Sequence, residues 1–141
     1  GYIHSGTMKY VVYSDDGAEH VVGLEFAGEF VADFPFSIHG DKARVTIIAD
    51  SDCEIYRYPV ATIAERLKTD DSLRDIIQRS TEVVFSQTYD RYVDLYCKTP
   101  AQRYHELIHR HPNLFNLFSL KDIASFLNIS PTHLSRLRHM K

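Results

Sequence analysis

The chain has 141 residues, 44% of them hydrophobic and 12% aromatic, so it is long enough to bury a core and to form one or two small domains. It contains neither an apolar run long enough to span a membrane nor a charged and apolar leader, and we expect a cytoplasmic protein. Its two cysteines, Cys53 and Cys97, exclude a disulfide framework and a four-thiolate iron–sulfur site, and we expect two reduced, half-buried thiols.

The net charge of −3 is distributed unevenly along the chain. Residues 98–141 hold seven Lys and Arg against two acidic residues, whereas the preceding 97 residues hold nine basic and seventeen acidic residues. A basic segment attached to an acidic body is typical of a DNA-binding module carried by a sensing or oligomerising domain.

The amino-terminal region has the pattern of a small antiparallel β-structure. Two β-rich runs, 9–13 and 20–26, flank an Asp-Gly pair, which is typical of a hairpin turn. Further strands are expected over 44–49 and 53–58, and short strands joined by turns predict a sandwich or barrel. Because Gly1 is not an initiator Met and the pattern begins almost at once inside a strand, we expect a fragment that lacks its own beginning.

A helical region follows the strands. Pro59 begins a short helical segment over 60–67, and a longer helical pattern runs from Ser72 to about Cys97. At about 1.5 Å per residue this helix is a rod of roughly 38 Å, too long to be covered by so small a barrel. We therefore expect residues 72–97 to pair with a second copy of the chain, and the alternative is a helix lying wholly on its own barrel. Its apolar stripe comprises Leu73, Ile76, Ile77, Val83, Val84, Tyr92, Val93 and Tyr96.

Residues 99–102, Thr-Pro-Ala-Gln, form a capping box with Pro in the first turn, which predicts a helix that runs to about Arg110. Residues 111–113 end it, and 114–118 form an apolar connector.

The segment 120–138, LKDIASFLNISPTHLSRLR, has the pattern of a helix-turn-helix. Apolar residues spaced by three and four up to Leu127 predict a first helix. Asn128 tolerates the left-handed conformation that ends helices, Ser130 is a natural N-cap, and Pro131 suits the first turn of a second helix.

The second helix is expected to bury Leu134 and Leu137 and to place a polar, basic face in the major groove of double-stranded DNA. Arginine suits guanine edges and phosphates, and we predict Arg136 as the main base reader. The predicted DNA-contacting set is Ser130, Pro131, Thr132, His133, Ser135, Arg136, Arg138, His139 and Lys121. One alternative is a helical hairpin that only packs. Another is a ligand-binding or scaffolding module that does not bind DNA and whose carboxyl-terminal helices dock a protein.

Residues 105–109 spell HELIH, the short form of a zinc-protease motif in which two His bind the metal and Glu activates water. The motif needs a third ligand and an open cleft, and His111 lies too close along the chain to be that ligand. We therefore expect no metal site and no enzyme. A zinc-dependent hydrolase that uses His105, Glu106 and His109 is a further alternative.

The order of a β-roll, a long helix and a helix-turn-helix, with Gly28-Glu29-Phe30 between strands and LKDIASFLNISPTHLSRLR near the end, resembles the Crp/Fnr family of bacterial transcription regulators. The resemblance covers the whole chain except the first part of the family's β-roll. It implies an α+β fold with an incomplete antiparallel β-roll, a double-stranded β-helix of cyclic-nucleotide-binding type, at residues 1–70. A dimerisation helix at 71–97 and a winged-helix-type DNA-binding domain at 98–141, with the wing missing, would follow. It also implies a homodimer that reads a palindromic operator and contacts RNA polymerase.

The resemblance further implies a small-molecule effector site that draws on Gly28, Glu29, Asp33, Arg44, Ser86 and Gln87. Asp33 would accept a ribose hydroxyl and Arg44 would pair with a phosphate. However, Ala32 stands where the family has a Gly that lets the backbone approach the ligand, and Arg44 falls one place out of register, which on a strand means the opposite face. These departures argue against cyclic AMP as the effector. The thiolates of the iron–sulfur sensors and an identifiable haem ligand are also missing, so no cofactor is assigned.

Overall fold

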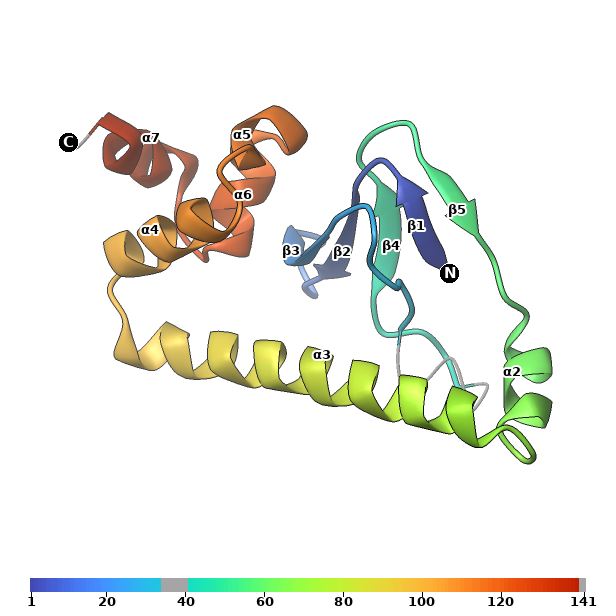
Figure 1. Cartoon of the computed structure of the whole chain (residues 1–141). Helices are drawn as coiled ribbons and strands as arrows, with labels where there is room; N and C mark the ends of the chain where they lie inside the picture. The colour runs from blue at the N-terminus through green and yellow to red at the C-terminus, as the bar shows by residue number, and fades with distance from the viewer. Residues whose placement is uncertain (34–40, 140–141) are drawn as a thin grey trace.

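The structure, a computed structural model, describes residues 1–33 and 41–139 (Figure 1). The strands lie together in one part of the molecule, and helix α3 (Asp71–Cys97) runs past them as a long rod. The chain turns back at the end of α3, so that the carboxyl-terminal helices lie beside the strands. This return of the chain determines where the helix-turn-helix segment sits.

The strands form two small antiparallel sheets. In one sheet, β1 (Tyr2–Ser5) pairs with β5 (Glu54–Tyr56). In the other, β2 (Met8–Tyr13) lies between β3 (Glu19–Glu25) and β4 (Thr46–Ala49), so β3 is an edge strand. The predicted antiparallel β-structure is confirmed.

The β2–β3 pair is the predicted hairpin, and Gly17 in its turn has a φ of 81°, which glycine adopts without steric cost. The other two predicted strands are present but shorter than expected, since 44–49 begins at Thr46 and 53–58 is reduced to Glu54–Tyr56. β1 is not evident from the sequence because four residues are too few to show an alternation of apolar and polar side chains.

The helices are α2 (Val60–Arg66), α3, α4 (Pro100–Arg110), α5 (Leu114–Leu117), α6 (Leu120–Phe126) and α7 (Pro131–His139). All but α5 correspond to predicted helices within about one residue at each boundary. The expected connector at 114–118 instead contains one helical turn. The predicted capping box is present, because the Thr99 hydroxyl accepts from the Gln102 amide and the Gln102 side chain accepts from the Thr99 amide at 2.9 Å.

The larger hydrophobic core runs from the second sheet into the carboxyl-terminal helices. Val11, Val21 and Leu24 of the hairpin belong to one continuous cluster with residues of α4 to α7. The helical members are Tyr104, Leu114, Phe118, Ile123, Ala124, Leu127, Leu134 and Leu137. A smaller core, formed by Ile3, Met8 and Val31, lies between the two sheets. The hairpin is therefore packed against the helix-turn-helix segment and not only against the other strands.

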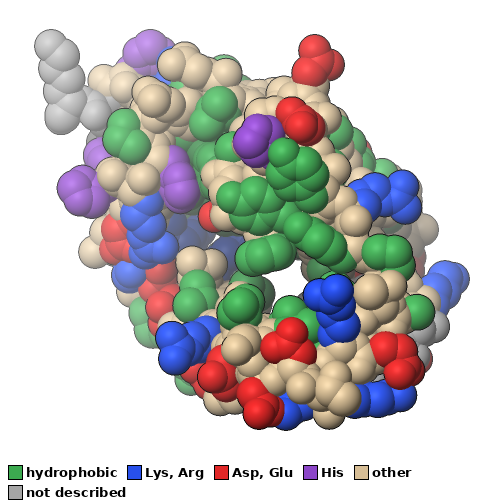
Figure 2. All heavy atoms as spheres, turned by 45° about the vertical axis from the view of Figure 1, so that its right-hand side comes forward, with side chains coloured by type: hydrophobic (Ala, Val, Ile, Leu, Met, Phe, Trp, Pro, Cys, Tyr) green, Lys and Arg blue, Asp and Glu red, His purple; other side chains and the backbone are tan. Residues whose placement is uncertain are grey.

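Helix α3 is covered poorly by the rest of the chain. None of its residues is buried, and the predicted stripe is only half-buried at Leu73, Ile77 and Val93. The space-filling view shows an opening through the molecule, bordered by hydrophobic side chains (Figure 2). No helix within the described residues combines the length and the apolar character needed to cross a membrane.

The two cysteines differ in exposure. Cys53 is half-buried, as predicted, and its thiol lies 3.2 Å from the carbonyl oxygen of Thr7. The prediction is wrong for Cys97, which is exposed as the last residue of α3, a helix with no buried residue.

The shared core predicts that a cavity in α6 destabilises the sheet as well as the helices. Replacing the fully buried Ile123 by Ala should lower the free energy of unfolding by about 2–5 kcal/mol. Leu120→Ala is the control, because that side chain lies on the same helix and is 42% exposed. Chemical denaturation followed by circular dichroism measures both variants, and equal stabilities would contradict the shared core.

Candidate functional site

The α6–α7 unit has the turn that the sequence predicts. Asn128 has a φ of 54°, the left-handed conformation, and ends α6. The amide of Ile129 donates to the Ala124 carbonyl at 3.0 Å, so the chain stays attached to α6 while it changes direction. Leu127 is buried and Ile129 packs against the same core.

Polar caps fix the start of both helices. The Ser119 hydroxyl accepts from the Asp122 amide at 3.1 Å at the start of α6. The Ser130 hydroxyl accepts from the His133 amide at 3.1 Å at the start of α7. Because Leu134 and Leu137 are buried, the rotation of α7 about its axis is fixed and one of its faces points to solvent.

Most of the predicted DNA-contacting residues are exposed on or next to α7. Pro131, Thr132, Ser135, Arg136, Arg138 and His139 are exposed on α7, Ser130 is exposed at its start, and Lys121 is exposed on α6. His133 differs, because it is half-buried. The Arg138 guanidinium lies 4.3 Å from the centroid of the Phe115 ring, a cation–π contact that limits its rotation.

The HELIH residues have another structural role on α4. The Glu106 carboxylate lies 2.7 Å from the Lys98 ammonium and 3.7 Å from the Arg110 guanidinium, so it joins the end of α3 to α4. Within residues 1–33 and 41–139, no group of three or more His, Cys, Asp or Glu is arranged to hold a metal ion. The hydrolase alternative would need Glu106 to activate water, whereas its carboxylate is engaged by two cations.

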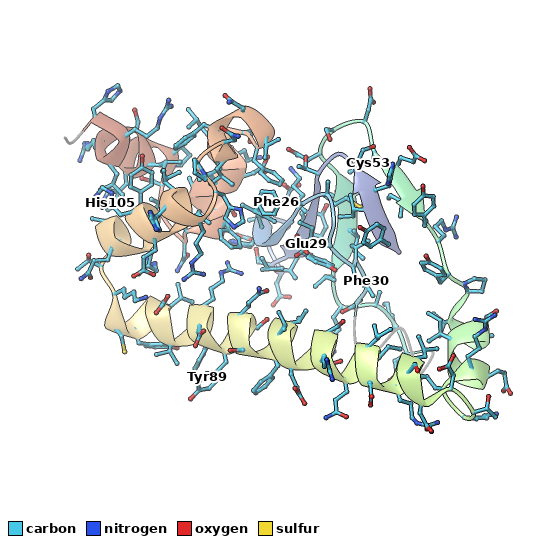
Figure 3. All side chains as sticks on the ribbon, viewed as in Figure 1. Phe26, Glu29, Phe30, Cys53, Tyr89 and His105 are labelled. Atoms are coloured by element: carbon cyan, nitrogen blue, oxygen red, sulfur yellow. The ribbon has the colours of Figure 1, made fainter. Side chains whose placement is uncertain are left out.

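The predicted effector residues are only partly brought together. Glu29 follows β3, where Figure 3 labels it, and its carboxylate accepts from the Phe26 amide at 2.7 Å. Asp33 and Arg44 do meet, but through the Arg44 backbone amide, which donates to the Asp33 carboxylate at 2.5 Å. The Glu29 and Asp33 carboxylates, which would contact an effector, thus each accept a hydrogen bond from a backbone amide of the chain.

Ser86 and Gln87, the remaining predicted effector residues, are exposed on α3. Gln87 lies one helical turn before Arg91, which contacts β3, so it shares the face of α3 directed at the strands. Ser86 lies on a different face and is not brought to the other predicted effector residues.

Glu25 and Glu29 form an acidic pair that the sequence does not predict. Burial, together with the charge and hydrogen bond of Glu29, raises the pKa of Glu25 to about 8. The sequence gives no sign of this pair, because Glu25 reads as an ordinary polar residue at the end of a strand.

The chain thus has antiparallel β-sheets, a long helix and a helix-turn-helix in series. Residues 1–70 match the family described as the cyclic nucleotide-binding domain. No curated protein sequence matches the chain.

Solved structures match the chain over nearly its whole length. A transcriptional regulator of the Crp/Fnr family from Eubacterium rectale is 16% identical to this chain, with a TM-score of 0.76. The match covers 98% of this chain and 66% of the regulator's chain. FixK2 from Bradyrhizobium japonicum is 16% identical with a TM-score of 0.79, covering 98% and 71%. The c-di-GMP responsive global regulator CLP from Xanthomonas campestris is 20% identical with a TM-score of 0.68, covering 98% and 74%.

Residues 1–70 are therefore similar to the cyclic nucleotide-binding domain family, and the chain as a whole has the fold of the Crp/Fnr regulators that it matches. The resemblance noted in the sequence is confirmed at this level. The chain spans about two thirds to three quarters of the length of the three structures, 66% to 74%.

The Glu25–Glu29 pair predicts a pH dependence of stability. Because the folded-state pKa of Glu25 is raised from 4.5 to about 8, the folded chain holds an extra proton between these values, and the free energy of unfolding falls as the pH rises through this range. In Glu25→Gln, the decrease in the free energy of unfolding over this pH range should be smaller by on the order of 2 kcal/mol. Denaturant titrations at several pH values measure it, with the exposed Glu54→Gln as control. A parallel pH profile for parent and Glu25→Gln would count against the pair.

Proposed function

We propose that this chain is a sequence-specific DNA-binding transcription regulator of Crp/Fnr type, which reads a palindromic operator as a homodimer. The observation that carries the proposal is the exposed polar and basic face of α7, held outward by the burial of Leu134 and Leu137. In this reading, residues 1–70 sense an effector, 71–97 pair the protomers and 98–141 bind DNA.

The chemistry of α7 supports insertion into a major groove. Thr132 and Ser135 offer hydroxyls that reach base edges or phosphates, and the last turn carries Arg136, Arg138 and His139. Arg136 is assigned to direct base contact. Arg138, whose guanidinium is stacked on the Phe115 ring, is better placed for a fixed phosphate contact, which would set the register of the helix on the duplex.

The exposed side of α3 supports a dimer of two copies of the chain. Phe85, Tyr89, Tyr92 and Tyr96 follow one another at spacings of four, three and four residues, and all four are exposed. The Phe85 and Tyr89 rings stack with 6.1 Å between centroids, and Tyr89 projects from α3 away from the strands (Figure 3). An apolar stripe of this length on a soluble helix is best covered by the same stripe of a second copy, which would also present two recognition helices to two half-sites.

We further propose that the effector is a small molecule other than cyclic AMP. The Glu29 and Asp33 carboxylates already accept from backbone amides, and their negative charges are unfavourable for the phosphate of a cyclic nucleotide. By the family resemblance, the DNA-bound dimer would contact RNA polymerase.

Replacing Arg136 by Ala tests the base contact. The variant should lose about 1–3 kcal/mol of affinity for a double-stranded site selected from random oligonucleotides while keeping its fold. Fluorescence anisotropy titrations at several salt concentrations measure the affinity. Arg57→Ala, which removes an exposed arginine after β5, is the matched control. Equal losses for both variants would argue against base reading by α7, and an affinity that does not fall with salt would favour a protein-docking module.

Replacing Tyr89 by Glu tests the dimer surface. A charge in the centre of the stripe should weaken self-association by about 2 kcal/mol or more. Tyr13 is an equally exposed tyrosine of β2, 56% exposed as Tyr89 is, and Tyr13→Glu serves as control. Sedimentation equilibrium reports the oligomeric state. A monomeric parent, or a Tyr89→Glu variant that remains dimeric, would exclude this surface.

A further inference from the structure

Three elements that are distant in the sequence meet at the side of β3 that faces the carboxyl-terminal helices. The Arg91 guanidinium, on α3, donates to the Val22 carbonyl of β3 and, at 2.8 Å, to the Phe126 carbonyl at the end of α6. The same guanidinium lies 4.0 Å from the centroid of the Phe126 ring. One side chain of the long helix thus holds both the sheet and the first helix of the helix-turn-helix.

A second polar contact joins the sheet to α6 from another strand. The Lys9 ammonium of β2 lies 2.9 Å from the Asp122 carboxylate of α6 and 3.2 Å from Asp50, which follows β4. The three side chains are only 12%, 7% and 16% exposed. The second Asp122 oxygen accepts from the Ser119 hydroxyl at 2.6 Å, so one carboxylate both completes the start of α6 and binds the sheet.

Burial would lower the pKa of Lys9, but hydrogen bonds to Asp122 and Asp50 outweigh this effect and raise it. Burial would likewise raise the pKa of Asp122, but hydrogen bonds from Lys9 and Ser119 lower it. Both groups are therefore charged at neutral pH, and the arrangement is an ion pair largely removed from water.

The contacts also complete the backbone of the edge strand. β3 is hydrogen-bonded to β2 on one side only, so its outer amides and carbonyls need other partners. The Ser125 hydroxyl of α6 accepts from the Val21 amide at 2.9 Å, and Arg91 binds the next carbonyl, that of Val22. Two successive residues of the edge are thus bound by α6 and α3.

We infer that Arg91 and the Lys9–Asp122 pair act together as a positioning junction, which holds α6, and with it α7, in one orientation relative to the hairpin and α3. The hydrophobic effect that drives the apolar packing is not directional, so polar contacts of fixed geometry add a restraint on orientation to that packing. Fixed hydrogen bonds and a paired buried charge restrict orientation. A displacement of α3 or of the hairpin is then passed to the recognition helix through this junction. The consequence for DNA rests on the proposed function, whereas the orientation itself does not.

The junction predicts how strongly different variants disturb the orientation of α6. Lys9→Met leaves Asp50 and Asp122 facing each other without a cation, so it should disturb the orientation more than Asp122→Asn, which leaves the Lys9–Asp50 pair. Arg91→Lys should also disturb it, because an ammonium lacks the planar fork that reaches two carbonyls and stacks on a ring. The matched controls are Lys68→Met and Arg74→Lys, whose side chains form exposed ion pairs.

The experiment uses the full chain with both native cysteines replaced by Ser and spin labels at Ala18→Cys, in the hairpin turn, and Ser135→Cys, on α7. Both positions are exposed, and dilution with unlabelled protein removes distances between protomers. Double electron–electron resonance should give one narrow distance distribution for the parent and both controls. Lys9→Met and Arg91→Lys should give a broadened or shifted distribution, and Asp122→Asn a smaller change, each with a helical circular dichroism spectrum.

Unchanged distributions in Lys9→Met and Arg91→Lys would overturn the inference, because the apolar core would then suffice. If Lys9→Met does not fold, Asp122→Asn and Arg91→Lys decide the question by the same measurement. On a selected DNA site, Lys9→Met should bind about tenfold more weakly than Lys68→Met. A parent that binds no DNA would refute the proposed function while the distance distributions still decide whether the junction exists.

Discussion

The attachment of α6 to the edge strand β3 is the constraint on which the rest of the structure depends. Val21 and Leu24 pack with Ile123 and Ala124, and the Ser125 hydroxyl accepts from the Val21 amide at 2.9 Å. This contact covers an otherwise open sheet edge and fixes α6 at the same time. Because the turn at Asn128 and the burial of Leu134 set α7 relative to α6, the direction of the outward face of α7 follows from the same contact.

The two sides of helix α3 make different contacts. One side carries Arg91 and, at its end, Asp94, which pairs with Lys98 at 3.0 Å, so it is attached to the sheet and to α4. The other side carries exposed aromatic residues that no other described part of the chain covers. A helix that contacts its own sheet on one side and a second copy on the other would connect the effector region, the dimer and the DNA-binding helices mechanically.

Elements whose signals are local could be predicted from the sequence, and contacts between distant segments could not. The turn at Asn128 and the capping box at Thr99 each depend on a few neighbouring residues, and both are confirmed. The Lys9–Asp122 pair joins residues 113 positions apart, so neither residue could be distinguished from an ordinary surface charge. The candidate effector residues remain a prediction from resemblance, and the structure shows that the Glu29 and Asp33 carboxylates bind local backbone amides.

The central claim is that the outward face of α7 recognises a DNA sequence. Selection of bound duplexes from a random oligonucleotide pool by the full chain, followed by sequencing, tests it most directly. The account predicts an enriched palindrome whose half-sites are about one helical turn apart from centre to centre. Failure to enrich any sequence, under conditions in which the chain is folded and dimeric, would contradict it.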